Sequence, residues 1–199
     1  MKENMNPLFT DMTWGAGGST ADLSMKLALE MRKSGHVANL HLTCTNMEKD
    51  GDPVKGVRDA LQQAHEGGIR NIVALRGDPP AGQDEWTATE GGFTCALDLV
   101  KYIRANYGQD FGIAVAGYPE GHPNAITEVK DDEVSSMSES EKGRCSNLDG
   151  KTFVCKDEDY EKELAYLKEK VDAGAGKFCL LNEFFFSLNH RDVIHGVIP

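Results

Sequence analysis

Short apolar runs along the chain alternate with longer segments in which apolar residues recur at helical spacing. The runs are rich in β-branched and aromatic residues, and most are apolar almost throughout, as is typical of strands covered on both faces. The predicted strands are residues 9–14, 38–43, 71–76, 112–117, 178–184 and 193–198. This alternation predicts parallel strands joined by right-handed crossovers, in either a doubly wound sheet or a β/α barrel.

Four helices are expected between these strands, and glycines mark their ends. They run from a cap at Ser19 or Thr20 to Gly35, from Pro53 to Gly67, over about 93–107, and over about 159–173. The expected apolar face of the first helix is Leu23, Leu27 and Met31. That of the second is Val57, Leu61 and Ala64, and that of the fourth is Leu164, Leu167 and Val171.

Residues 124–156 break this pattern, because they carry many charges and almost no apolar clustering. Such a segment buries too little surface to offset its ordering entropy. We therefore expect one domain over residues 1–199 with a flexible acidic insertion loop at about 124–156. A regulatory or partner-binding element, with serines open to phosphorylation, is the alternative.

The chain is short for a closed barrel, which needs roughly 250 residues, because the insertion takes up part of its 199 residues. Only a short segment separates the predicted strands 178–184 and 193–198, whereas a parallel crossover needs about a dozen residues. Either a helix is missing there or the last strand is wrong. If the fold is a barrel, we therefore expect it to be incomplete in these residues.

Composition narrows the function. The chain is 40% hydrophobic and 27% charged, as in an ordinary globular protein. Its 32 acidic and 21 basic residues give a formal net charge of -11, which argues against a nucleic-acid partner. Because no run approaches the roughly 18 apolar residues of a membrane span, and the N-terminal residues lack a secretory pattern, we expect no membrane partner and a cytoplasmic location.

The five cysteines lie far apart with no CxxC pair, so we expect reduced thiols rather than a disulfide framework or a zinc finger. Cys44 has two interpretations. It is either a nucleophile paired with a distant histidine or a small buried strand residue, and we favour the second.

Polar residues follow the predicted strands, where parallel α/β folds bind ligands. Thr13 precedes a glycine-rich turn, and His41 ends the second strand as either a core residue or a ligand. Arg76, Gly77 and Asp78 follow the third strand, and the sequence GYPEGHP follows the fourth with Tyr118 and His122. A structural ion pair could use Arg76 and Asp78, but with the aromatic ring and imidazole added we favour a ligand site.

These runs carry a resemblance to a known family. The segments TWGAGG, HLTC, NIVALRGDPP, EGGFTCALDLVKYIR, VAGYPEGHP and YLKEKVDAGA, in this order, resemble the eukaryotic type of methylenetetrahydrofolate reductase catalytic domain. The resemblance covers about residues 7–123 and 157–175. It implies an α/β fold, a (β/α)8 TIM-type barrel of which the first strand and one or more C-terminal strands are missing here. It also implies that the barrel binds FAD and, in the complete enzyme, forms homo-oligomers. NAD(P)H would reduce the flavin, which would then convert 5,10-methylenetetrahydrofolate into 5-methyltetrahydrofolate for methionine synthesis.

The resemblance also implies roles for individual residues. Asp78 would be catalytic, because a carboxylate near the flavin and the folate can stabilise a cationic iminium. Asn182 falls where the family has a folate-binding glutamine. The implied FAD contacts are Thr13, His41, Leu75, Arg76, Gly77, Asp78, Ala96, Tyr118, His122, Glu163 and Lys170. No metal is implied.

The sequence also departs from the family. The Glu-Phe-Phe-Pro-Pro motif, whose glutamate is the family's general acid, has no counterpart in these residues. Glu163 stands where an aspartate is common, and Cys95 replaces a tyrosine near the flavin. These departures keep an alternative open, in which the chain is a non-catalytic or truncated paralogue that binds FAD or an intact reductase subunit without turnover.

Overall fold

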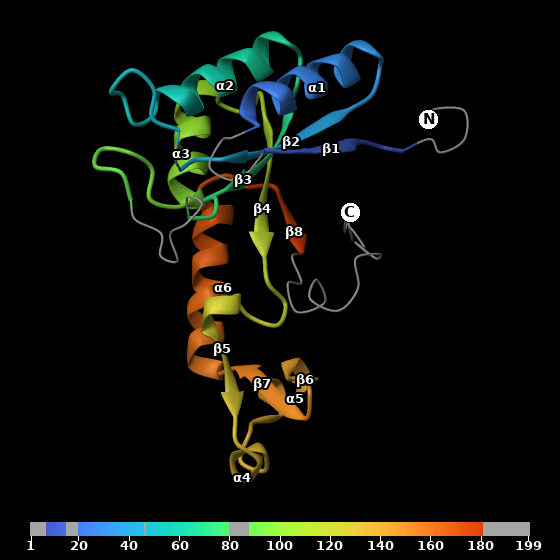
Figure 1. Cartoon of the computed structure of the whole chain (residues 1–199), viewed down its shortest axis with the longest axis vertical. Helices are drawn as coiled ribbons and strands as arrows, with labels where there is room; N and C mark the ends of the chain where they lie inside the picture. The colour runs from blue at the N-terminus through green and yellow to red at the C-terminus, as the bar shows by residue number, and fades with distance from the viewer. Residues whose placement is uncertain (1–6, 15–19, 46, 80–87, 181–199) are drawn as a thin grey trace. The chain divides into compact units, whose positions relative to one another are not determined.

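The computed structural model describes residues 7–14, 20–45, 47–79 and 88–180 (Figure 1). The chain divides into two compact units, the first formed by Met1–Val115 with Asp172–Lys177 and the second by Ala116–Val171 with Phe178–Pro199. We describe each unit by itself. No helix in the described part of the chain is long and apolar enough to cross a membrane.

The main sheet has five strands in the order β1-β2-β3-β4-β8. Its strands are β1 (Thr10–Thr13), β2 (Ala38–Thr43), β3 (Asn71–Leu75), β4 (Gly112–Gly117) and β8 (Lys177–Leu180). The pairs β1–β2, β2–β3 and β3–β4 are parallel. The α/β class with a parallel sheet is therefore confirmed. Because the strand order follows the chain without the reversal of a doubly wound sheet, it favours the barrel, whose closure stays a prediction.

Strand periodicity divides this sheet into an apolar and a more polar face. Leu40, Leu42 and Ile72 point to one face and are fully buried. The intervening residues of β2, Asn39 and His41, point to the other face, which therefore carries amide and imidazole groups. In the register of the parallel pairs, Thr13 lies opposite His41 at the carboxyl end of the sheet.

Helix α2 (Lys55–Glu66) has the predicted apolar face, since Val57, Leu61 and Ala64 are all buried. Helix α3 (Ala96–Tyr107) ends at Gly108 as predicted, although it begins three residues later than expected. The predicted strand 178–184 is present as β8, and its residues beyond 180 and the whole strand 193–198 lie outside the described residues.

The predicted face of α1 (Ala21–Lys33) is wrong. Leu23 is 57% exposed and Leu27 is 46% exposed, while Ser24 and Ala28 are buried. Met25 is buried on the same face, and the Ser24 hydroxyl is satisfied by donating to the backbone oxygen of Thr13 at 2.8 Å. Spacing alone left both faces of this helix possible.

Helix α6 (Asp157–Asp172) also differs from the prediction. Leu164 and Val171 are about half exposed, and Lys170 is the residue that is buried. Lysine can do this because its aliphatic stem packs against apolar surface and its ammonium can find an oxygen. Leu167 is partly buried.

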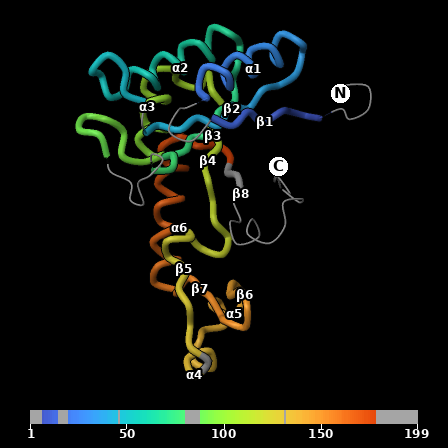
Figure 2. The backbone as a smooth tube through the Cα atoms, in the orientation of Figure 1, coloured from blue at the N-terminus to red at the C-terminus, as the bar shows by residue number. Residues whose placement is uncertain are grey.

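The segment 124–156 holds regular structure where a loop was expected. After the 3-10 turn η2 (Pro123–Ala125), three strands form an antiparallel sheet in the order β5-β7-β6, and Figure 2 follows the chain through them. The elements are β5 (Ile126–Val129), α4 (Asp131–Val134), α5 (Glu139–Arg144), β6 (Ser146–Leu148) and β7 (Lys151–Cys155). Their core is Val129, Met137 and Val154, which are distant in the sequence and pack together because the chain reverses direction between the strands. The flexibility of this segment stays a prediction.

Candidate functional site

In unit 1, the carboxyl ends of the first three strands are tied together by backbone hydrogen bonds beyond the strands themselves. The amide of Trp14 donates to the His41 oxygen at 3.2 Å, and the amides of Cys44 and Thr45 donate to the Arg76 oxygen at 3.2 and 3.1 Å. The Thr45 hydroxyl donates to that same oxygen at 2.7 Å. These bonds fix the backbone of the Arg76-Gly77-Asp78 turn against the end of β2.

Gly77 is required at this turn. Its φ of +105° lies in the region that L side chains rarely adopt, and a Cβ would lie 2.7 Å from the Thr45 hydroxyl. The same Cβ would lie 3.1 Å from the Cβ of Thr43. The turn places Asp78 in an exposed position and leaves Arg76 partly buried. A cation and a carboxylate therefore stand two residues apart on a backbone whose course is fixed.

His41 is held by a residue that the sequence analysis did not select. Its Nε2 donates to Oδ1 of Asp11 at 2.9 Å, and the side-chain amide of Asn39 donates to that same oxygen at 2.6 Å. The side chains of His41 and Asp11 are only 17% and 21% exposed. The available signal was the polar residues at alternate positions of two consecutive strands, Asp11 and Thr13 in one and Asn39 and His41 in the next.

Two further buried polar atoms lie at this edge. The Oγ1 of Thr43 and the Nε1 of Trp14 are buried without a hydrogen-bond partner among the described residues. Unsatisfied buried groups of this kind are uncommon in proteins and often accompany a functional site.

The remaining predicted residues of unit 1 have simpler surroundings. Thr13 is exposed at the end of β1, Leu75 is partly buried at the end of β3, and Ala96 is buried at the first position of α3. Unit 1 thus supplies Thr13, His41, Leu75, Arg76, Gly77, Asp78 and Ala96.

Cys44 is a buried residue, as we favoured. It is 1% exposed, and burial raises the pKa of its thiol to about 12. Because the thiolate is the nucleophilic form, this cysteine is unreactive near neutral pH. The four cysteines whose side chains are described, Cys44, Cys95, Cys145 and Cys155, all carry free thiols.

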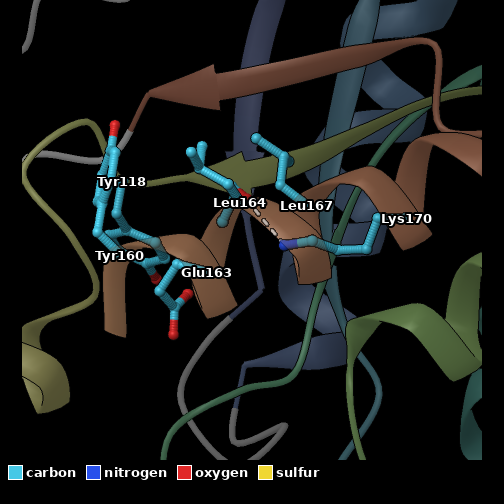
Figure 3. Close-up of a pocket in the computed structure, with 8 residues that line it drawn as sticks. Tyr118, Tyr160, Glu163, Leu164, Leu167 and Lys170 are labelled. Carbon is cyan, nitrogen blue, oxygen red and sulfur yellow. Dashed lines mark hydrogen bonds between the residues drawn. The ribbon is translucent and has the colours of Figure 1, made fainter. Parts of the chain in front are cut away.

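In unit 2, the end of β4 and one face of α6 line a hollow with about 270 Å³ of empty space, part of it open to solvent. Figure 3 shows Tyr118 and Lys170 at opposite sides of it. Lys170 is 5% exposed, and its ammonium donates to the Ala116 oxygen at 3.0 Å. The ammonium also lies 4.5 Å from the ring centre of Tyr166. Glu163 lines the same hollow.

The rings of Tyr118 and His122 pack edge to face, with their centres 4.7 Å apart. The Nδ1 of His122 accepts a hydrogen bond from the backbone amide of Asn124 at 3.2 Å. In the neutral ring the proton is therefore on Nε2, which can act as a donor. Unit 2 thus supplies Tyr118, His122, Glu163 and Lys170, while Asn182 lies outside the described residues.

Within the part of the chain that the structure describes, no group of three or more His, Cys, Asp or Glu side chains could hold a metal ion. The parallel strands and their helices define an α/β protein, and the charged side chains at the strand ends of unit 1 have the features of a ligand-binding site in that fold class. The family model for methylenetetrahydrofolate reductase matches residues 1–190. The chain belongs to the methylenetetrahydrofolate reductase family.

Individual relatives carry the name of the same family. The chain is 49% identical over 170 residues to a "Probable methylenetetrahydrofolate reductase (NADH)" of Oryza sativa subsp. japonica, which covers 85% of this chain and 24% of the rice protein. It is 39% identical over 187 residues to "Methylenetetrahydrofolate reductase 2" of Saccharomyces cerevisiae, covering 93% of this chain and 25% of the yeast protein. The chain thus spans about a quarter of the length of these relatives.

Proposed function

We propose that this chain forms FAD-binding parts of a (β/α)8 barrel that reduces 5,10-methylenetetrahydrofolate to 5-methyltetrahydrofolate with NAD(P)H. Bound FAD would supply hydride-transfer chemistry between the nicotinamide and the folate. Support comes from the family and from one observation above the others, the buried ammonium of Lys170 beside a hollow. Homo-oligomer formation and a cytoplasmic location belong to the same proposal.

Lys170 carries the proposal because a buried lysine is rare unless it has an anionic or strongly polar partner. Its stem is packed in α6 and its ammonium is held at the Ala116 oxygen, so the positive charge has a fixed position. A fixed cation beside an open hollow suits an anionic cofactor such as the diphosphate of FAD. Tyr118 and the Nε2 proton of His122 add an aromatic face and a hydrogen-bond donor.

The residues of unit 1 also fit such a cofactor. Within unit 1, Arg76 supplies a cation, and the absence of a side chain at Gly77 allows a ligand to approach the backbone. The Thr43 hydroxyl and the Trp14 indole nitrogen, which have no hydrogen-bond partner among the described residues, lie at this same edge. The exposed Asp78 carboxylate has the charge needed to stabilise a cationic iminium of the folate substrate. Asn182 is proposed as a folate ligand on the resemblance alone.

Flavin binding tests this proposal. The purified 199-residue chain is examined for flavin absorbance and titrated with FAD while flavin fluorescence is followed. We expect stoichiometric binding that weakens about tenfold or more in Lys170→Met and Arg76→Ala, since each removes one charge-assisted contact. The exposed Lys168→Met and Arg58→Ala are matched controls and should bind FAD as the parent chain does.

A folded chain that binds no FAD would contradict the proposal. FAD binding without reduction of 5,10-methylenetetrahydrofolate by NADH or NADPH would instead favour the paralogue that binds the cofactor without turnover. The two co-substrates are compared in the same assay.

A further inference from the structure

Asp11, Asn39 and His41 form a linked group on the polar face of the main sheet. In the parallel register of β1 and β2, Asp11 lies opposite Asn39, and Thr13 lies opposite His41. All of these positions therefore share one face of the two strands. One carboxylate oxygen of Asp11 accepts from both the Asn39 amide, at 2.6 Å, and the His41 Nε2, at 2.9 Å.

This arrangement determines the state of the imidazole. An ionised carboxylate can only accept hydrogen bonds, so the Nε2 of His41 must carry the proton. The neutral ring is then left with Nδ1 as its acceptor. Asn39, which is 9% exposed, also fixes Asp11, because its side-chain amide donates to the same carboxylate oxygen. The ring of His41 is thereby restricted in both tautomer and orientation, as metal-bound histidines are by a carboxylate behind them.

We propose that Asp11 is a positioning residue for His41, which it holds in the Nε2-protonated tautomer so that the ring presents Nδ1 to the cofactor. The inference rests on the proposed role of His41 as an FAD contact. Asp11 itself acts through His41. Without the carboxylate, both ring tautomers become available and the ring loses its fixed orientation.

The hydrogen bond is tested first, without any cofactor. In the full chain with ¹⁵N-labelled histidine, long-range ¹H–¹⁵N NMR spectra report which ring nitrogen of His41 is protonated. We expect the Nε2-protonated form in the parent chain and a mixture of tautomers in Asp11→Ala. The second aspartate–histidine pair of unit 1 is the control: His65 Nε2 donates to Asp110 at 2.8 Å. Asp110→Ala should change the His65 signals and leave those of His41 unchanged.

FAD titration of the same variants tests the consequence. Asp11→Ala should bind FAD about tenfold more weakly, because the His41 ring must then be fixed in its binding tautomer and orientation when FAD binds. Asp110→Ala should bind as the parent chain does. Asp11→Asn keeps an oxygen acceptor and the side-chain shape, so it should restore the Nε2 tautomer and part of the affinity. Circular dichroism of each variant shows whether it is folded.

The outcomes separate the two proposals. If Asp11→Ala leaves the His41 tautomer unchanged, or changes it with no effect on FAD affinity, the positioning role is overturned. If the parent chain binds no FAD, the proposed function fails and the positioning role toward FAD fails with it. The NMR spectra then still decide whether Asp11 sets the tautomer of His41.

Discussion

The parallel strands β1, β2 and β3 of unit 1 and the small antiparallel sheet of unit 2 are stabilised in different ways. In the parallel sheet, Leu40, Leu42 and Ile72 are completely buried, and they belong to a large apolar core. The antiparallel sheet β5-β7-β6 has a core cluster of three buried residues, Val129, Met137 and Val154. A large core can support polar groups at its strand ends, whereas a small core needs polar interactions to hold it together.

Arg144 provides many of those interactions in unit 2. Its guanidinium donates to the Cys155 oxygen at 2.9 Å and to the carboxylate of Asp157, and it lies 4.2 Å from the ring centre of Tyr160. The Ser138 hydroxyl donates to the same carboxylate at 2.6 Å. These contacts join α5, β7 and the start of α6. Hydrogen bonds therefore stabilise this part of unit 2, whereas buried apolar side chains stabilise unit 1.

The largest effect is expected in the core of unit 1. Leu40→Ala should lower the free energy of unfolding by about 2–5 kcal/mol, because it removes fully buried methyl groups and leaves a cavity. Urea denaturation followed by circular dichroism measures the change. Leu23→Ala, at a leucine that is 57% exposed, is the matched control and should stay within about 0.5 kcal/mol. Equal losses in the two variants would contradict the assignment of the α1 faces.

The next effect separates the two sheets. Arg144→Met keeps the aliphatic stem but removes the donors to Cys155 and Asp157, so it should destabilise the antiparallel sheet by about 2–3 kcal/mol. Amide hydrogen exchange should accelerate in β7 and stay slow in β2. Lys142→Met is the control, because the ion pair of Lys142 with Glu139 is exposed and contributes little to stability. Faster exchange in both sheets would show that Arg144 supports more than unit 2.

Sequence patterns predicted the parallel sheet better than the small one. The strands at 38–43 and 112–117 have the predicted bounds, because continuous apolar runs are themselves the signal for buried strands. The pairing of β5 with β7 joins Val129 to Thr152, and such long-range contacts leave no local period. One local signal was present, since Ser138 and Glu141 have capping-box spacing and do cap α5.

The candidate site shows the same limit. The strand ends at His41, Arg76 and Tyr118 were predictable because parallel folds place ligand residues there. The acceptor of the His41 proton was not, since Asp11 reaches it only through the register of β1 and β2. The burial of Lys170 was also missed, because helical spacing assigned the inward positions of α6 to leucine and valine.

A smaller effect is expected at the turn after β3. Gly77→Ala should cost about 1–2 kcal/mol, because alanine is strained at a φ of +105°. Its new methyl group also meets Thr43 and Thr45, so FAD affinity should fall as well. Gly51→Ala separates the two causes, since Gly51 has a φ of +77° with nothing within 4 Å of the added carbon. It should lower stability alone, and a loss of FAD affinity in Gly51→Ala would refute this explanation.

The smallest expected effect is a dependence of the stability of unit 2 on pH in the acid range. The hydrogen bond from Ser138, and then the Arg144 guanidinium, hold the pKa of Asp157 below its ordinary value of 3.8. Since folding lowers this pKa, the ionised carboxylate stabilises the folded state above pH 3.8, and this contribution is lost as the pH falls through the lower folded-state value. The effect is small because the side chain is 44% exposed and solvent screens its charge.

An acid titration between pH 6 and roughly pH 2, followed by NMR signals of β7 and of β2, measures this dependence. The β7 signals should change near the bottom of that range before those of β2 do. Asp157→Asn is the matched variant, since its amide keeps the shape of the side chain but does not titrate. In that variant the early change in β7 should disappear. An unchanged acid transition would assign it to other carboxylates and remove Asp157 from the interactions that hold the small sheet together.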